Sequence, residues 1–250
     1  RGCSFVGNKA VNGGAIHCNA ETRVTNCSFT ANSATSIGGA LQGCKNCADC
    51  LFADNTSAYF SGHCFQSVIN NSRFSGLGTV GNSQCFNCVF DGARTTDDDL
   101  WNRGLIMAVN NSPHTAECVN CLFVNCNCFY MMQSWGLPLS VVNCTFLDNA
   151  VTTVGSSANV VRSQGVLFND SAASASRMTV VNCAFARTEE DAGIYDVAQV
   201  GSTANDYRGD LTVVSGKNTL EPSGYGNVML FLSNYPDEVC GAYEVQAGAG

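Results

Sequence analysis

A short motif, Cys-x-Phe, recurs along most of this chain, and its recurrence restricts the fold more than any other feature of the sequence. The phenylalanines of the motif and of its near match are Phe5, Phe29, Phe52, Phe74, Phe90, Phe123, Phe146 and Phe185. Successive members lie 24, 23, 22, 16, 33, 23 and 39 residues apart. A spacing near 22 residues that tolerates insertions and deletions is typical of a solenoid, in which one small unit is stacked on the next.

The residues before each phenylalanine predict a short buried strand. In VNCLF (residues 119–123) the valine, cysteine and phenylalanine occupy alternate positions, so all three should point to one face of a strand. The cysteine position is occupied by Cys3, Cys27, Cys50, Cys88, Cys121, Cys144 and Cys183, with Ser72 replacing it beside Phe74. We therefore expect inward-facing ladders of cysteine and phenylalanine side chains. Ladder neighbours would have Cβ atoms ~4.8 Å apart, beyond the ~3.8 Å that disulfides favour, so we expect most of these cysteines to be thiols.

Turn residues follow each predicted strand. An asparagine lies three residues after four of the phenylalanines, at Asn8, Asn32, Asn55 and Asn149, and should mark a turn. Gly-Gly-Ala at residues 13–15 and 38–40 should form a corner before the next strand. No helical period is visible in these repeats. The sequence therefore predicts an all-β fold, a right-handed parallel β-helix (solenoid) with coils of about 22 residues.

The presence or absence of the repeated motif divides the chain into two regions of one domain. Residues 1–187 carry the regular repeats, with a loop insertion near residues 91–118. Residues 188–250 contain apolar, strand-like runs without the motif, so we expect irregular terminal coils and a C-terminal tail there.

The two motifs resemble those of a known group of surface proteins. GGAI and GGAL, together with FVGN, FTAN, FADN and FLDN, are similar to the GGA[ILV] and FxxN repeats of chlamydial polymorphic membrane proteins and of related bacterial and protist β-helix surface proteins. The ending CGAYEVQ (residues 240–246) is similar to the GAYE tail of secreted bacterial β-helix proteins. The resemblance implies a β-helix and an extracellular or cell-surface location. The chain differs from the chlamydial proteins because it shows no C-terminal membrane-barrel segment.

Charge and hydropathy exclude several classes of function. The net charge is −8, and the three lysines are scattered, so we expect no nucleic-acid partner. No apolar run approaches the ~20 residues of a membrane helix, so we expect no membrane insertion by this chain. No cofactor motif is legible, and no Ser/His/Asp arrangement suggests a catalytic site. We therefore expect no cofactor and no catalytic residues.

Three groups of residues are weak candidates for ligand or metal binding. The insertion contains Asp97, Asp98 and Asp99, which are weak metal candidates because consecutive aspartates lack the alternating spacing of converging ligands. Trp101, Arg103 and His114 could form a ligand-binding loop, although we favour a solvated loop packed on the coil. CKNCADC (residues 44–50) and CNC (residues 126–128) leave open a zinc site, a disulfide or buried thiols, of which thiols are favoured. Glycosylation sequons begin at Asn26, Asn55, Asn70, Asn110, Asn143 and Asn169.

Two classes of function remain. The favoured one is a non-enzymatic extracellular scaffold, either an adhesin stalk or a subunit of an end-to-end filament. Its partners would be the chain itself or a longer β-helix, stacked end to end, and a host-surface or polysaccharide ligand. The alternative is a protein that binds or degrades polysaccharides. Asp54 and Asp148 recur two residues after a phenylalanine, but four coils would separate them by roughly 19 Å, too far for a glycosidase pair.

Overall fold

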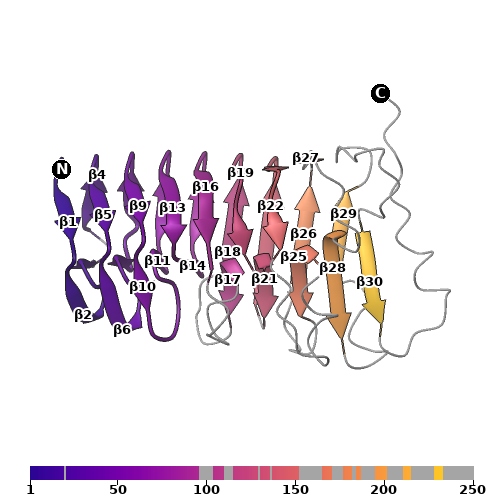
Figure 1. The fold of residues 1–250 in the computed structure, drawn as a ribbon, viewed down its shortest axis with the longest axis horizontal. Helices are drawn as coiled ribbons and strands as arrows, with labels where there is room; N and C mark the ends of the chain where they lie inside the picture. The colour runs from indigo at the N-terminus through magenta and orange to yellow at the C-terminus, as the bar shows by residue number, and fades with distance from the viewer. Residues whose placement is uncertain are drawn as a thin grey trace.

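In the structure, a computed structural model, the chain forms a parallel β-solenoid (Figure 1). The structure describes residues 1–19, 21–95, 104–109, 115–128, 130–135 and 137–151, followed by the backbone of the strands from Gly165 to Leu232. Every strand pair among these residues is parallel, and each strand pairs with its counterparts in the preceding and following coils. The predicted all-β solenoid is therefore confirmed.

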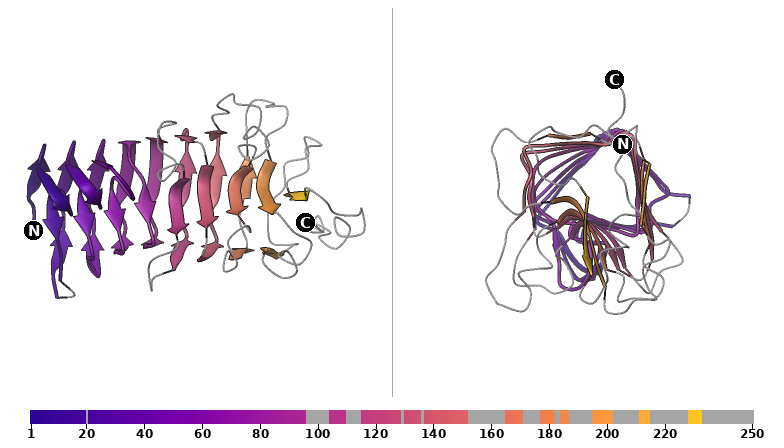
Figure 2. Two further views of the ribbon diagram at one scale, coloured as in Figure 1. Left: turned by 90° about the horizontal axis from the view of Figure 1, so that it is seen from below. Right: turned by 90° about the vertical axis from the view of Figure 1, so that its right-hand side faces the viewer.

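Four sheets run along the stack, and three of them enclose the core (Figure 2). The Phe sheet contains β1 (Ser4–Val6), β5 (Ser28–Thr30), β9 (Leu51–Ala53), β13 (Arg73–Leu77), β16 (Val89–Arg94), β19 (Leu122–Val124), β23 (Thr145–Leu147) and β27 (Ala184–Ala186), with β20 (Asn127–Cys128) and β24 (Ala150–Val151) attached through β16. The Val/Cys sheet contains β4 (Arg23–Thr25), β8 (Asn46–Ala48), β12 (Val68–Asn70), β15 (Gln84–Phe86), β18 (Ala116–Val119), β22 (Pro138–Val142), β26 (Arg177–Val181) and β29 (Leu211–Val214).

The other long sheet is the aliphatic sheet. It contains β3 (Ile16–His17), β7 (Leu41–Gln42), β11 (Cys64–Phe65), β14 (Val80–Gly81), β17 (Gly104–Val109), β21 (Tyr130–Trp135), β25 (Gly165–Asp170), β28 (Tyr195–Gly201) and β30 (Val228–Leu232). A short sheet of β2 (Lys9–Asn12), β6 (Ser33–Ile37) and β10 (Thr56–Ser57) is confined to the first three coils. We number the coils by their phenylalanine, from coil 1 with Phe5 to coil 7 with Phe146. A complete coil passes from the Val/Cys sheet to the Phe sheet and then to the aliphatic sheet.

The predicted phenylalanine ladder forms the centre of the core. The rings of the first seven phenylalanines stack with centroids 4.6 to 5.0 Å apart and planes within 10° of parallel. Phe29 to Phe146 are buried, and Phe5 at the end of the stack is half-buried. The register Phe146 to Phe185 continues the same column in the backbone of β27.

The cysteine ladder is present, but its place in the coil differs from the prediction. Asn120 has a positive φ of 55°, so the chain turns there from β18 into β19. VNCLF is therefore a corner between two sheets and not one strand. The buried residues of β18 are Ala116 and Cys118, whereas Val119 is only half-buried. Cys121 lies just after the corner and is buried.

The ladder extends into the first coil, where the Cys3 thiol donates to the carbonyl of Arg1 at 3.4 Å. Cys27, Cys50, Cys88, Cys121 and Cys144 are buried, and Ser72 fills the gap between them. Cys3 is exposed, because no described coil precedes it. Cys183 lies outside the described residues.

The asparagine turns also differ in detail from the prediction. The left-handed residue is the one before the asparagine, with φ of 52° at both Ala31 and Asp54. The following Asn32 and Asn55 are fully buried, because their side chains turn inward. The predicted Gly-Gly-Ala corner is confirmed at Gly39, where a Cβ would lie 2.2 Å from the carbonyl oxygens of Thr56 and Gly62. No side chain fits there.

Candidate functional site

Three corners recur in successive coils, and each is built in the same way. At the corner between the Val/Cys and Phe sheets, the left-handed residues are Gly2, Asn26, Asp49, Asn71, Asn87, Asn120 and Asn143. At the corner after the Phe sheet they include Gly7, Ala31, Asp54, Gly92, Asn125 and Asp148, and at the third they are Gly43, Gln66 and Asn82. Asparagine, aspartate and glycine are the residues that adopt this conformation most readily.

A small hydrogen-bonding side chain follows these left-handed residues. At the first corner it donates to the backbone carbonyl two residues earlier, over 2.9 to 3.5 Å between donor and oxygen. The donors are Cys3, Cys27, Cys50, Ser72, Cys88, Cys121 and Cys144. Ser67 and Ser83 do the same at the third corner. Apart from the Arg1 carbonyl, each of these carbonyls also accepts a backbone N–H from the preceding coil, so the thiol or hydroxyl adds a second donor at the corner, which is a structural role.

The other cysteines are also core thiols. Each of the fourteen cysteines that the structure describes is free, and all of these except Cys3 are buried. Burial raises the pKa of Cys64 and Cys128, and it raises the pKa of Cys126 to about 12, so these groups stay protonated at neutral pH. Within the described part of the chain, no group of three or more His, Cys, Asp or Glu side chains could hold a metal ion.

A column of asparagines runs beside the rings in coils 1 to 3, and it is exposed at Asn8 and buried at Asn32 and Asn55. The side-chain oxygen of Asn32 accepts from the backbone N–H and the amide of Asn8, at 3.0 and 2.9 Å. The side-chain oxygen of Asn55 accepts from both groups of Asn32 at the same distances. The Asn55 amide donates to the carbonyl of Phe29 at 2.9 Å. Asn149 repeats the arrangement in coil 7, where its oxygen accepts from the N–H of Cys126.

His63 closes this column at coil 3. Its ring is fully buried and lies 5.5 Å from the Phe74 ring and 6.2 Å from the Phe52 ring. Its Nδ1 lies 3.2 Å from the Asn55 amide nitrogen and accepts from it, so the proton of the neutral ring sits on Nε2. Nε2 is buried and has no hydrogen-bond partner. Burial lowers the pKa of His63 to about 3, although the charge of Asp54 acts in the opposite direction.

The carboxylates considered for a polysaccharide enzyme belong to corners. Asp54 is exposed, and its Oδ1 accepts from the N–H of Leu77 in the next coil at 2.8 Å. Asp148 occupies the same left-handed position four coils further on. Asp97, Asp98, Asp99, Trp101, Arg103 and His114, the candidates from the insertion, lie outside the described residues.

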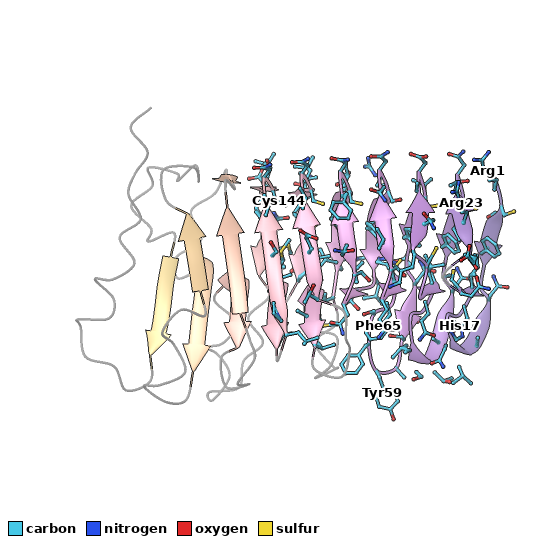
Figure 3. The ribbon with its side chains drawn as sticks, turned by 180° about the vertical axis from the view of Figure 1, so that it is seen from behind. Arg1, His17, Arg23, Tyr59, Phe65 and Cys144 are labelled. Atoms are coloured by element: carbon cyan, nitrogen blue, oxygen red, sulfur yellow. The ribbon has the colours of Figure 1, made fainter. Side chains whose placement is uncertain are left out.

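Two surface features were not anticipated from the sequence. A polar hollow of about 140 Å³ lies at the third corner, lined by Lys45, Gln66, Ser67, Val68, Asn82, Gln84 and Thr115. Tyr59 projects from the edge of the stack that carries the short sheet, at the side opposite Cys144, and is 54% exposed (Figure 3). The register that brings Lys45, Gln66 and Gln84 together depends on coils of unequal length, which a sequence motif does not reveal.

Comparisons of the chain with protein-family models, curated proteins and solved structures found no match. Among the residues that the structure describes, no helix is long and apolar enough to cross a membrane. The fold and its corners define a parallel β-solenoid repeat protein.

Proposed function

We propose that this protein is a non-enzymatic extracellular scaffold, which acts as a surface adhesin stalk or as a subunit of an end-to-end filament. The observation that carries the proposal is the continuity of the core: the ring stack and the corner side chains run from coil to coil through coil 7. Such a column extends the molecule along one axis, which suits a spacer or stalk. The similarity of the GGA[ILV] and FxxN motifs to those of polymorphic membrane proteins supports a surface location.

End-to-end association is supported by the outer edge of coil 1. The N–H of Ser28 donates to the carbonyl of Cys3, so Ser4, opposite Ser28 in the register, directs its own N–H and carbonyl away from the stack. Val6 lies opposite Thr30, and the Thr30 carbonyl accepts from the N–H of Gly7. The N–H and carbonyl of Val6 therefore also point away from the stack. Backbone groups that point outward from coil 1 can pair with a strand of a further coil.

Charge supports the same arrangement. Residues 1–19 contain Arg1 and Lys9 and no acidic residue. Residues 188–250 contain ten acidic and two basic residues, a net charge of −8 that equals the net charge of the whole chain. A head-to-tail contact would bring the basic end of one copy to the acidic end of another. Such a heterologous contact does not close on itself and produces a fibre.

Sedimentation velocity with electron microscopy tests this function. We expect the 250-residue chain to form rods whose length rises with protein concentration and falls with added salt. Val6→Pro removes one outward N–H and should leave short particles, whereas Val6→Thr should assemble as the parent does. End-to-end assembly would be contradicted if the parent sedimented as a single chain at every concentration and Val6→Pro behaved in the same way.

Polysaccharide binding is the second candidate, and the polar hollow favours it. The Lys45 ammonium and the Gln66 amide are donors suited to an acidic sugar, whereas the Gln84 amide donates to the Glu117 carboxylate at 2.9 Å. Calorimetric titration with an oligogalacturonate is the test. Binding that Lys45→Met removes and Lys9→Met retains would support this candidate, and the absence of heat would exclude it.

A further inference from the structure

One sequon lies in the fully buried part of the core. Asn55, Thr56 and Ser57 form an Asn-x-Ser sequence, the acceptor for N-linked glycans. Asn55 has no exposed surface. Its amide nitrogen donates to the carbonyl of Phe29 at 2.9 Å and faces Nδ1 of His63 at 3.2 Å, so both amide hydrogens are engaged.

Glycosylation would remove one of these hydrogens and add a large polar group. In that reaction the Asn55 nitrogen forms a bond to the first sugar carbon and loses a proton, and the oligosaccharide leaves its lipid-pyrophosphate carrier. The product could not occupy the column, because Asn32, Asn55 and His63 are fully buried and in hydrogen-bond contact, which leaves no space for a sugar.

Two other sequons provide the contrast. Asn26 and Asn143 are exposed left-handed residues at the first corner, and each begins an Asn-Cys-Ser or Asn-Cys-Thr sequence. Their side chains extend from the edge of the stack, so a glycan there would project into solvent. The fold thus tolerates modification at the repeat's corner and excludes it at Asn55.

We infer that modification of Asn55 is incompatible with the fold, and that the chain matures by a route in which the unfolded polypeptide does not meet an N-glycosylating enzyme. This inference is independent of the scaffold proposal. If the protein is displayed outside a cell, it is exported by a route without N-glycosylation.

The experiment expresses the chain behind a secretion signal in a eukaryotic cell that N-glycosylates its secreted proteins. The total chain is extracted in denaturant with reductant and then refolded in reductant, so that thiol oxidation does not influence the result. Limited proteolysis separates folded from unfolded molecules, and mass spectrometry of the glycopeptides gives the occupancy of each sequon in both fractions.

We expect glycans at Asn26 and Asn143 in both fractions and glycans at Asn55 only in the protease-sensitive fraction. Ser57→Ala removes the sequon and leaves Asn55 in place, and it should raise the resistant fraction to that of unglycosylated protein. Thr145→Ala, which removes the exposed sequon at Asn143, should not change the resistant fraction. Equal occupancy of Asn55 in the two fractions would overturn the inference. Absence of any glycan on Asn55 in the total pool would also overturn the inference, because the sequon would then place no constraint on the route by which the chain matures.

Discussion

Acidification should destabilise the solenoid through His63. The ring is neutral and fully buried in the folded state, with a pKa of about 3, compared with 6.5 for an ordinary histidine. Between these two values the unfolded chain holds a proton on His63 that the folded chain does not. Stability is therefore complete above pH 6.5 and is lost progressively as the pH falls towards 3.

The size of the effect follows from the pKa shift. Each pH unit below 6.5 costs about 1.4 kcal/mol of unfolding free energy, so the loss reaches about 2 kcal/mol at about pH 5. For a chain of this length, about 2 kcal/mol corresponds to a decrease in Tm of roughly 4–8 °C. The orphaned Nε2 does not oppose this loss, because a second proton on the ring would sit on Nδ1 and face the Asn55 amide, which is itself a donor.

The measurement is thermal unfolding followed by circular dichroism at a series of pH values. His63→Ala is the matched control, because His63 occupies the position that Ala40 holds in the preceding coil. The variant should start from a lower Tm, since it leaves a cavity, but its Tm should vary less with pH. Parallel pH profiles for the parent and His63→Ala would refute the argument.

Three further predictions concern the corners and the insertion. Cys144→Ser should change stability by less than about 1 kcal/mol in urea unfolding, because Ser72 holds the same position in another coil. Cys144→Asp should cost several kcal/mol, because it buries an unpaired carboxylate. Equal urea midpoints for the two variants would contradict the ladder. Gly39→Ala should cost about 3 kcal/mol because its Cβ meets backbone oxygens, whereas Gly7→Ala, with open space around it, should cost only about 1 kcal/mol for its positive φ. Replacing the aspartates of residues 97–99 with asparagine should leave Tm unchanged with or without calcium, and a calcium-dependent Tm lost in the variant would restore the metal-site hypothesis.

The recurrence of the Cys-x-Phe motif, with its asparagine turns and Gly-Gly-Ala corners, was sufficient to predict the fold. The phenylalanine spacing gave the number and order of the coils through Phe146, because a parallel stack aligns equivalent residues and the ring column has no alternative register. The position of the cysteines within the coil was predicted less well. Alternation of Val119 and Cys121 fits a single strand, and only the left-handed backbone at Asn120 shows that a corner separates them.

The details of the interior depended on contacts between coils. Asn55 was interpreted as a turn residue because asparagine favours turns, but its hydrogen bonds to Asn32 and Phe29 cross to the preceding coil, and its hydrogen bond to His63 joins two corners of coil 3. A motif within one coil carries no information about such partners. The polar hollow was missed for the same reason, since Lys45 and Gln84 belong to different coils.

The recurrence of equivalent corners also bears on how such a chain can change in length during evolution. A coil contacts mainly its two neighbours, so gain or loss of one complete coil recreates an interface of the existing kind. Removing coil 3, for example, would place Phe29 against Phe74 and Cys27 beside Ser72, pairs that differ little from those present now. A duplication that begins and ends at equivalent left-handed corners would be accommodated in the same way, whereas one out of phase would leave a carbonyl without its thiol or hydroxyl donor. Selection can therefore adjust the reach of this protein in steps of one strand spacing, ~4.8 Å, without redesigning its core.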